Sequence, residues 1–514
     1  MDLLTSCIRA DGEYAQLLAA VRAAFRDKPL PLLANGLCEG ATEAFMTSLI
    51  EDVCTKAAPD GGVSRTGRRR CALIVCPEEK DCVRLRQTLE RFGLRAAFYT
   101  PRDLSFYNVT ASHEYEHERM RVLSGLAAGT LDAVITTPDA ALSYTVPPDV
   151  LRAASVRLDF HTPVDPGTLA ERLVAAGYNR VDLVEGAGQF AVRGGIIDVF
   201  APFGTYIDDE GELRAGSYPL RVELFGDEID RMGLFDPETQ RMTCAVDEAE
   251  LLPSREVLTD AAGLERLAAA IAAQRKSARS DEARRTLAEE AAAVAAARAE
   301  QTPTGAGLHF LDRYIRLVYP EPACLLDYFP ERTLFLIRSN AAVQDRLRGG
   351  EKLLNEQVVS LCESGLLAGK YAEFARPAAA FERFLESNVT VHVDSLSYGM
   401  SGRRLGGIFG FRTRHMVSYA DNLRLLCEDV TRYREGGYRI AVIAENETAA
   451  RSLADLFADA GIPAAIPAPG SADTPDAMPR GTVLIHWRSY LFGYELMVPR
   501  IAILSTNPDS RTGS

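Results

Sequence analysis

The amino-acid sequence predicts an α/β protein: a parallel-sheet domain, an antiparallel α+β domain inserted into it, and a small separate C-terminal α/β domain. Three observations support this fold class. Short apolar runs alternate with amphipathic helical segments early in the chain and return near residue 334. Residues 158–252 instead contain closely spaced alternating segments separated by turns, a pattern typical of antiparallel strands. From Val389 onward, strand-like runs and helical segments alternate again.

The first domain is expected to contain buried parallel strands. The apolar run at 71–76 is followed by Pro77 and a helical pattern that ends at Gly93. A second run at 132–137 follows an amphipathic segment, and a third at 334–337 lies far downstream. Short apolar strands joined through helices favour a parallel sheet that is covered on both faces.

Two further regions complete the expected order of elements. Residues 261–301 are rich in Ala and in charges of both signs, which predicts a long solvated helical hairpin. The C-terminal domain opens at Val389 and contains strand-like runs at 439–445, 481–487 and 500–506. It has no glycine-rich phosphate loop and no clustered acid and base, so no function is predicted for it. We place the boundaries at 1–146 and 254–388 for the first domain, 147–253 for the inserted domain and 389–510 for the C-terminal domain.

Composition excludes several classes of protein. Of the 514 residues, 47% are hydrophobic and 25% are charged, so the chain is neither disordered nor fibrous. Its 57 Lys and Arg against 71 Asp and Glu give a net charge of −14, which argues against a protein that mainly grips a nucleic-acid backbone. The start lacks a signal-peptide pattern and no apolar run could span a bilayer, so we expect a cytoplasmic protein without a membrane partner. The ten cysteines lack zinc-ligand spacing and indicate reduced, mostly buried thiols.

An H-E-x-x-H motif is the most conspicuous chemical pattern. On a helix, His113 and His117 would face one way and could chelate zinc, with Glu114 as a general base. A working zinc site needs a third ligand and a dry supporting shell, whereas this motif lies among charged residues in a solvated first helical turn. We therefore predict an ordinary helix and no metal site, and keep a zinc hydrolase as a remote alternative.

The segment PLLANGLCEGATEAF has the frame of a phosphate-binding loop without its charge. In G-x-x-x-x-G-K-[ST], backbone N–H groups cradle the phosphates and the Lys reaches the β and γ groups. Here Asn35 takes the place of the first glycine and Gly40 that of the second, while Ala41 stands at the lysine and Thr42 at the hydroxyl ligand. By itself, this window fits a coincidental loop better than a decayed nucleotide site.

Longer strings carry a resemblance to a known family. GQFAVRGGIIDVFAPF, LRVELFGDEIDRMGLFDPETQR and ACLLDYFPERTLFLI closely resemble segments shared, in this order, by the bacterial excinuclease protein UvrB and the N-terminal part of the transcription-repair coupling factors (Mfd). YNVTASHEYEHERMRVLSGLAAGTLDAVITTPDAAL resembles the coupling factors rather than UvrB, and it places the H-E-x-x-H in a plain helix of that family. The likeness runs from about residue 15 to about residue 505.

The resemblance implies that the first domain is a degenerate RecA-like helicase domain. UvrB is a working ATP-dependent helicase, which needs the P-loop lysine and an acidic pair for Mg²⁺. This sequence has Ala41 at the lysine and I-R-S-N at 337–340, where the acidic pair belongs. In lacking both groups, the sequence resembles the coupling factors, whose N-terminal half has no motor activity. The intact coupling factor is an ATP-dependent DNA translocase. We expect no enzymatic activity and no cofactor, with an active UvrB-like helicase as the alternative.

The resemblance also implies partners. The N-terminal half of the coupling factors recruits the excinuclease protein UvrA to stalled polymerases, which indicates a recruitment module of transcription-coupled nucleotide excision repair. RNA polymerase and DNA are contacted in this family through C-terminal domains of which the sequence has no trace. We therefore expect an N-terminal fragment of a longer protein.

The resemblance assigns the binding of UvrA to the inserted domain. In a strand, successive side chains point to opposite faces, so Val192 and Val222 can face the core while Arg193 and Arg221 face outward. That geometry alone fits an ordinary solvated sheet face. The resemblance implies a charged binding patch, because these positions match those at which UvrB contacts UvrA; Ala191 replaces a second arginine of UvrB, which implies a lower affinity. The implied binding residues are Arg180, Arg193, Arg221 and Glu223.

Overall fold

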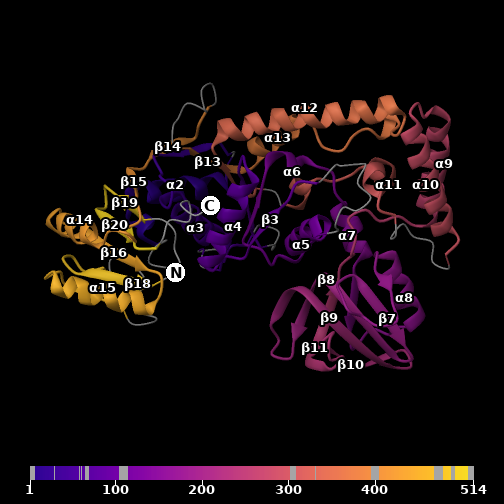
Figure 1. Cartoon of the computed structure of the whole chain (residues 1–514), viewed down its shortest axis with the longest axis horizontal. Helices are drawn as coiled ribbons and strands as arrows, with labels where there is room; N and C mark the ends of the chain where they lie inside the picture. Colours follow the sequence, from indigo (N-terminus) through magenta and orange to yellow (C-terminus); the bar gives the residue numbers. More distant parts are fainter. Residues whose placement is uncertain are drawn as a thin grey trace. The chain divides into compact units, whose positions relative to one another are not determined.

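A computed structural model describes most of the chain (Figure 1). The described residues are 6–27, 29–56, 58, 61–63, 69–102, 114–300, 308–329, 332–394, 404–467, 478–487 and 493–507. The chain divides into two compact units, the first formed by Met1–Ala96, Glu331–Val343 and Leu385–Ser514 and the second by Ala97–Pro330 and Gln344–Phe384. Within the described ranges, no helix is both long enough and apolar enough to cross a membrane.

A parallel sheet forms the centre of the first unit. The strands of this sheet that belong to the first unit lie in the order β14-β1-β13-β12-β2, and each neighbouring pair is parallel. The residues of β2 are buried throughout, as the apolar run at 71–76 predicts. The bounds are η1 (Cys7–Ala10), α2 (Gly12–Ala24), β1 (Leu32–Asn35), α3 (Ala41–Cys54), β2 (Ala72–Val75), α4 (Glu79–Arg91), β12 (Leu334–Arg338), β13 (Val389–Asp394) and β14 (Gly407–Gly410).

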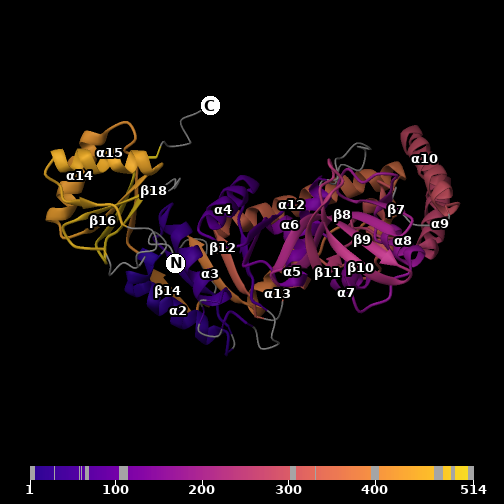
Figure 2. The same cartoon turned by 90° about the horizontal axis from the view of Figure 1, so that it is seen from below.

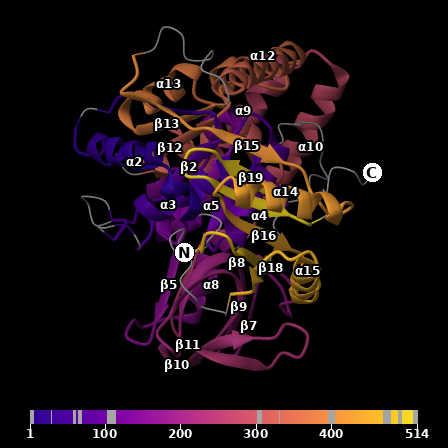
Figure 3. The ribbon, with the colours of Figure 1, turned by 90° about the vertical axis from the view of Figure 1, so that its left-hand side faces the viewer.

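A mixed sheet with helices α14 and α15 occupies the C-terminal part of the first unit. Its order is β15-β19-β20-β16-β18-β17, in which β16 runs parallel to β20 and β18 while β19 is antiparallel to its neighbours. Helix α15 packs beside β18 (Figures 2 and 3), and Leu453 and Phe457 of this helix lie in the core. The bounds are β15 (Thr413–Met416), α14 (Leu423–Glu435), β16 (Arg439–Ala444), α15 (Glu447–Asp459), β17 (Ala464–Ala465), β18 (Val483–Trp487), β19 (Gly493–Leu496) and β20 (Ile501–Ser505).

The strand that begins at Val389 was expected to open this C-terminal sheet, and that expectation was wrong. Strand β13 pairs with β1 and β12 of the parallel sheet, and β14 pairs with β1. A fully buried strand has no exposed face whose pattern could indicate its neighbours, and parallel partners come from distant parts of the chain.

The second unit contains the predicted helical hairpin and an antiparallel sheet. Helices α9 and α10 form the hairpin predicted for residues 261–301 and lie side by side in Figures 1 and 2. The bounds outside the inserted sheet are β3 (Ala96–Tyr99), α5 (Glu114–Ala128), β4 (Ala133–Thr136), α6 (Pro138–Leu142), α7 (Pro148–Ala154), α9 (Ala261–Ser277), α10 (Asp281–Arg298), η2 (Leu311–Tyr314), α11 (Ile315–Val318), η3 (Leu325–Tyr328), α12 (Asn340–Ser364), η4 (Gly369–Tyr371) and α13 (Ala378–Ser387).

The inserted sheet has the order β5-β11-β10-β9-β8-β7-β6, and β11 also pairs with β8. Its neighbouring strands are antiparallel except for the short β6–β7 pair, which confirms the predicted α+β insertion. Helix α8 packs against it, and its Asp165 N-cap accepts a hydrogen bond from the Thr168 backbone. The bounds are β5 (Val156–Asp159), α8 (Pro166–Ala175), β6 (Asn179–Arg180), β7 (Gln189–Arg193), β8 (Ile196–Asp208), β9 (Leu213–Phe225), β10 (Glu228–Phe235) and β11 (Met242–Leu251).

Candidate functional site

The inserted sheet has two chemically different faces. Val192, Val222 and Leu224 pack into the core that includes Leu169 and Leu173 of α8, so the predicted alternation of these strands is confirmed. The residues between them therefore lie on the opposite face, which we call the outer face.

Strand register places the charged residues of the outer face in two rows. In the first row, Ala191 of β7 is opposite Asp198 of β8, which is opposite Arg221 of β9. In the second row, Arg193 is opposite Ile196, which is opposite Glu223, and Arg231 of β10 completes the row. The structure therefore brings Arg193, Arg221 and Glu223 onto one face.

Asp198 organises the arginines of this face. Its side chain is 1% exposed, and its carboxylate accepts hydrogen bonds from Nε of Arg221 at 2.6 Å and from Nη2 of Arg221 at 2.9 Å. The same carboxylate forms an ion pair with Arg193. A carboxylate held in a bidentate pair of this kind fixes the plane of the guanidinium as well as its position.

Arg221 and Arg193 differ in what they leave accessible. The Arg221 guanidinium also donates to the Gln240 carbonyl at 2.8 Å and stacks over the Phe235 ring at 5.0 Å. The hydrogen bond to Asp198 raises the pKa of Arg221 above its ordinary value. The side chain of Arg193 is 43% exposed, against 13% for Arg221, so Arg193 is the arginine of this pair that a partner can reach.

Arg180 lies apart from the other three predicted residues. It belongs to the two-residue edge strand β6, where its register partner is Phe190, a residue of the α8-side core. Arg180 is exposed, but it extends the sheet edge rather than the outer face.

Sequence reasoning missed Asp198 and Arg231. Both stand at outward positions of their strands, so the alternation that located Arg193 could have located them. That two arginines converge on Asp198 depends on strand register, which the sequence alone does not reveal.

The phosphate-loop frame is present as a strand, a loop and a helix. Strand β1 ends at Asn35, and helix α3 begins at Ala41 directly after Gly40, whose φ of 87° is readily adopted only by glycine. Ala41 is fully buried, and the Thr42 hydroxyl donates to the Cys38 carbonyl at 3.0 Å. The hydroxyl at the metal-ligand position is therefore engaged within the loop.

An internal carboxylate occupies the helix end that would face a phosphate. Glu43 is 4% exposed, and its Oε2 accepts a hydrogen bond from the Gly40 backbone N–H at 2.6 Å. Its Oε1 lies 3.6 Å from Nη1 of Arg338, the last residue of β12. Arg338 stands in the segment 337–340, where the acidic pair of an active helicase is expected. The charges of a nucleotide site are thus reversed here, with the anion supplied by α3 and the cation by β12.

The H-E-x-x-H motif lies on and before helix α5. His113 lies outside the described residues, and α5 begins at Glu114. The His117 ring packs edge-on against Phe203 of β8, with centroids 6.0 Å apart. Among the residues that the structure describes, no three His, Cys, Asp or Glu side chains are grouped to hold a metal ion.

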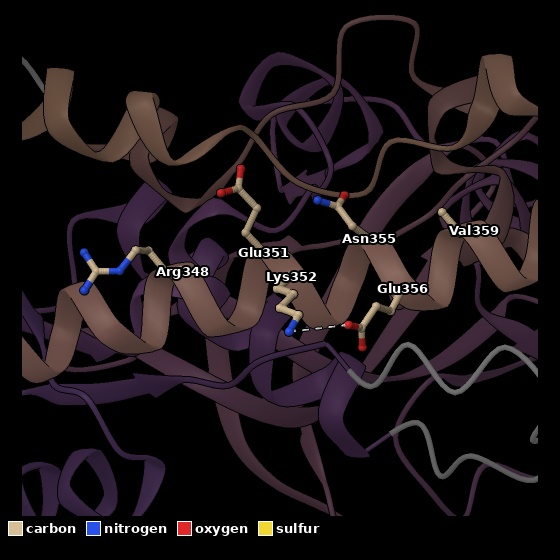
Figure 4. Close-up of a pocket in the computed structure, with 6 residues that line it drawn as sticks. All are labelled: Arg348, Glu351, Lys352, Asn355, Glu356 and Val359. Carbon is tan, nitrogen blue, oxygen red and sulfur yellow. Dashed lines mark ion pairs between the residues drawn. The ribbon is translucent and has the colours of Figure 1, made fainter.

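Two hollows flank helix α12 in the second unit. The first, shown in Figure 4, is lined by Arg348, Glu351, Lys352, Asn355, Glu356 and Val359, all from α12, so no second element lines this hollow. Its Lys352 and Glu356 approach only to 3.9 Å and are mostly exposed. The second, of about 570 Å³, includes Arg102 and Arg376, which are ion-paired with Glu256 and Asp327. Neither hollow brings together a catalytic set.

Comparison with known proteins identifies the inserted sheet. Residues 156–256, which contain the outer face, match the family described as the UvrB interaction domain. Over 77% of its length the chain is 25% identical to a transcription-repair-coupling factor of Bacillus subtilis. The chain resembles the transcription-repair-coupling factors.

Two further relatives carry the same name. A coupling factor of Myxococcus xanthus is 38% identical over 142 residues, which are 27% of this chain and 11% of the relative. One from Staphylococcus epidermidis is 22% identical over 77% of this chain and 32% of its own length. The chain thus spans about a third of the length of the Bacillus and Staphylococcus relatives, in an N-terminal region.

Proposed function

We propose that the chain is a non-catalytic recruitment module of transcription-coupled nucleotide excision repair that binds the excinuclease protein UvrA through the outer face of the inserted domain. The observation that carries this proposal is the Asp198-centred pair of arginines within the segment that matches the UvrB interaction domain. Arg193 and Glu223 form the proposed contact together with the less exposed Arg221, which also holds Asp198 in place, and Arg180 extends it along the sheet edge. No cofactor is part of the proposal.

The rival function is an active ATP-dependent helicase resembling UvrB. Phosphoryl transfer depends on positioning and on cations that stabilise the transferred group. The loop offers Ala41 where a lysine is needed, and Glu43 brings negative charge to the place of the phosphate. These features favour the non-catalytic function.

The test is a calorimetric titration of the full chain with purified UvrA. Truncating one partner of a buried, hydrogen-bonded charge pair at an interface typically costs about 2 to 5 kcal/mol, so Arg193→Ala should weaken binding by roughly thirtyfold or more if UvrA buries this side chain as proposed. The matched control is Arg214→Ala, because Arg214 also pairs with an aspartate, Asp208, and is 52% exposed at the other end of the β8–β9 ribbon.

The two variants separate the outcomes. The proposal predicts weakened binding for Arg193→Ala and unchanged binding for Arg214→Ala, with normal melting curves for both. An equal affinity for the wild type and Arg193→Ala, or no binding of the wild type, would contradict it.

A further inference from the structure

The turn between β9 and β10 presents an aromatic side chain to water. Phe225 is 83% exposed, the largest fraction for any large hydrophobic residue in the described part of the chain. It pairs with Glu228 across a two-residue turn, in which Gly226 has a φ of 67°. A large apolar side chain on a tight turn releases hydrophobic free energy when a partner covers it.

The backbone that carries Phe225 is fixed before any partner binds. The carbonyl of Asp227, in the turn, accepts a hydrogen bond from the Val164 backbone N–H at 2.7 Å. The backbone N–H of Leu224 donates to the Gly195 carbonyl at 2.7 Å, which joins this turn to the turn that follows Arg193. A preformed backbone reduces the conformational entropy that binding must remove.

Phe225 stands at the end of the outer face. It follows Glu223 by two residues in β9, so both belong to the same face, and Glu223 lies opposite Arg231 and Ile196. Arg193 lies across Ile196 in the same row and is exposed, as is Arg231. An exposed aromatic residue beside arginines is the composition typical of the residues that dominate protein interfaces.

We propose that Phe225 is the apolar anchor of the outer face and inserts into an apolar socket on a partner protein whose rim carries carboxylates opposite Arg193 and Arg231. This inference rests on the proposed function and names the residue that supplies most of its hydrophobic binding. A protein is favoured over a nucleic acid, because Glu223, Asp227 and Glu228 lie around Phe225 and would repel phosphates.

The experiment measures the affinity of the full chain for UvrA by calorimetry. The variants are Phe225→Ala, Phe225→Leu and the control Leu213→Ala, since Leu213 is 55% exposed at the opposite end of the same strand. We expect Phe225→Ala to weaken binding by about tenfold or more, Phe225→Leu to weaken it less, and Leu213→Ala to leave it unchanged. Since Phe225 and Leu213 are both exposed, all three variants should have the melting temperature of the wild type.

The outcomes distinguish this inference from the function on which it rests. If the wild type binds and Arg193→Ala weakens binding while Phe225→Ala does not, the anchor is overturned and the proposed function stands. If Phe225→Ala and Leu213→Ala weaken binding equally, the effect is not specific to the outer face and the anchor is also overturned. If the wild type does not bind UvrA, both proposals are overturned.

Discussion

Two buried carboxylates set the local chemistry of this protein. Asp198 holds Arg221 and Arg193 on the outer face of the inserted sheet. Glu43 fills the loop before α3 and pairs with Arg338. In both places a buried carboxylate pairs with an arginine that could otherwise bind an external anion. Only Arg193 also stays accessible to a partner.

Replacing Glu43 tests the internal carboxylate. Glu43→Ala leaves the buried Gly40 N–H and the Arg338 guanidinium without this acceptor, so we expect the free energy of unfolding to fall by about 3 kcal/mol. Glu43→Gln should cost less, because its amide oxygen can still accept from Gly40. Denaturant unfolding of the three proteins measures both effects.

Adding ATP and Mg²⁺ to the wild type tests whether the loop before α3 binds a nucleotide. The melting temperature and the release of phosphate are measured. The wild type should show no change in melting temperature and no phosphate release. ATP turnover that disappears in Thr42→Ala would contradict the non-catalytic account.

At the scale of elements, helix α5 supports the base of the inserted domain. Glu116 accepts from Nε of Arg255 at 3.0 Å and from the Glu256 backbone N–H at 2.7 Å. Glu256 is buried and pairs with Arg102 at 2.8 Å and Arg119 at 3.0 Å. The H-E-x-x-H helix therefore fixes the segment through which the chain leaves the inserted sheet.

This cluster predicts a pH dependence. Burial alone would raise the pKa of Glu256, but Arg102 and Arg119 outweigh it and the pKa is lowered below its ordinary value. A lowered pKa in the folded state contributes stability above the unfolded-state pKa of about 4.3, and that contribution is lost as the pH falls toward the folded-state pKa. The free energy of unfolding of the wild type minus that of Glu256→Gln should therefore decrease as the pH falls below about 4.3.

Glu290 provides the control of opposite sign. Burial raises the pKa of Glu290 more than Arg313 lowers it. The free energy of unfolding of the wild type minus that of Glu290→Gln should therefore increase as the pH falls. Urea titrations between neutral pH and acid measure both differences. A pH-independent difference for Glu256→Gln would contradict the role of this ion cluster.

The sequence predicted individual helices and strands better than it predicted which strands pair with one another. Alternation correctly placed Val192 and Val222 in the core, and composition predicted the α9–α10 hairpin, because both signals are local. The sheet that β13 joins and the burial of Asp198 depend on partners distant in sequence, so local patterns could not predict them. The pairing of Arg180 with Phe190, which makes Arg180 part of an edge strand, is likewise a contact that a local pattern does not reveal.

At the scale of the whole molecule, charge limits the possible partners. The net charge of −14 opposes association with a nucleic-acid backbone, which requires several neutralised phosphates. The basic triplet at residues 68–70 is partly engaged in the fold: Arg70 stacks over Phe25 at 4.7 Å and donates to the Val53 carbonyl. Arg68 lies outside the described residues.

We therefore predict weak binding to double-stranded DNA. Fluorescence anisotropy with a labelled duplex at about 0.15 M salt should give no sub-micromolar affinity, since non-specific DNA binding weakens steeply with salt even for basic proteins. Tight, sequence-independent binding by the full chain would contradict this prediction.

Hydrogen exchange of the full chain with and without UvrA measures where this partner binds. We expect UvrA to slow exchange in β7, in the β7–β8 and β9–β10 turns and in the adjoining parts of β8, β9 and β10. Exchange in α9, α10, α14 and α15 should be unchanged, because these helices lie outside the inserted sheet. Protection confined to those helices, or no protection in the inserted sheet at saturating UvrA, would show that UvrA does not bind the outer face.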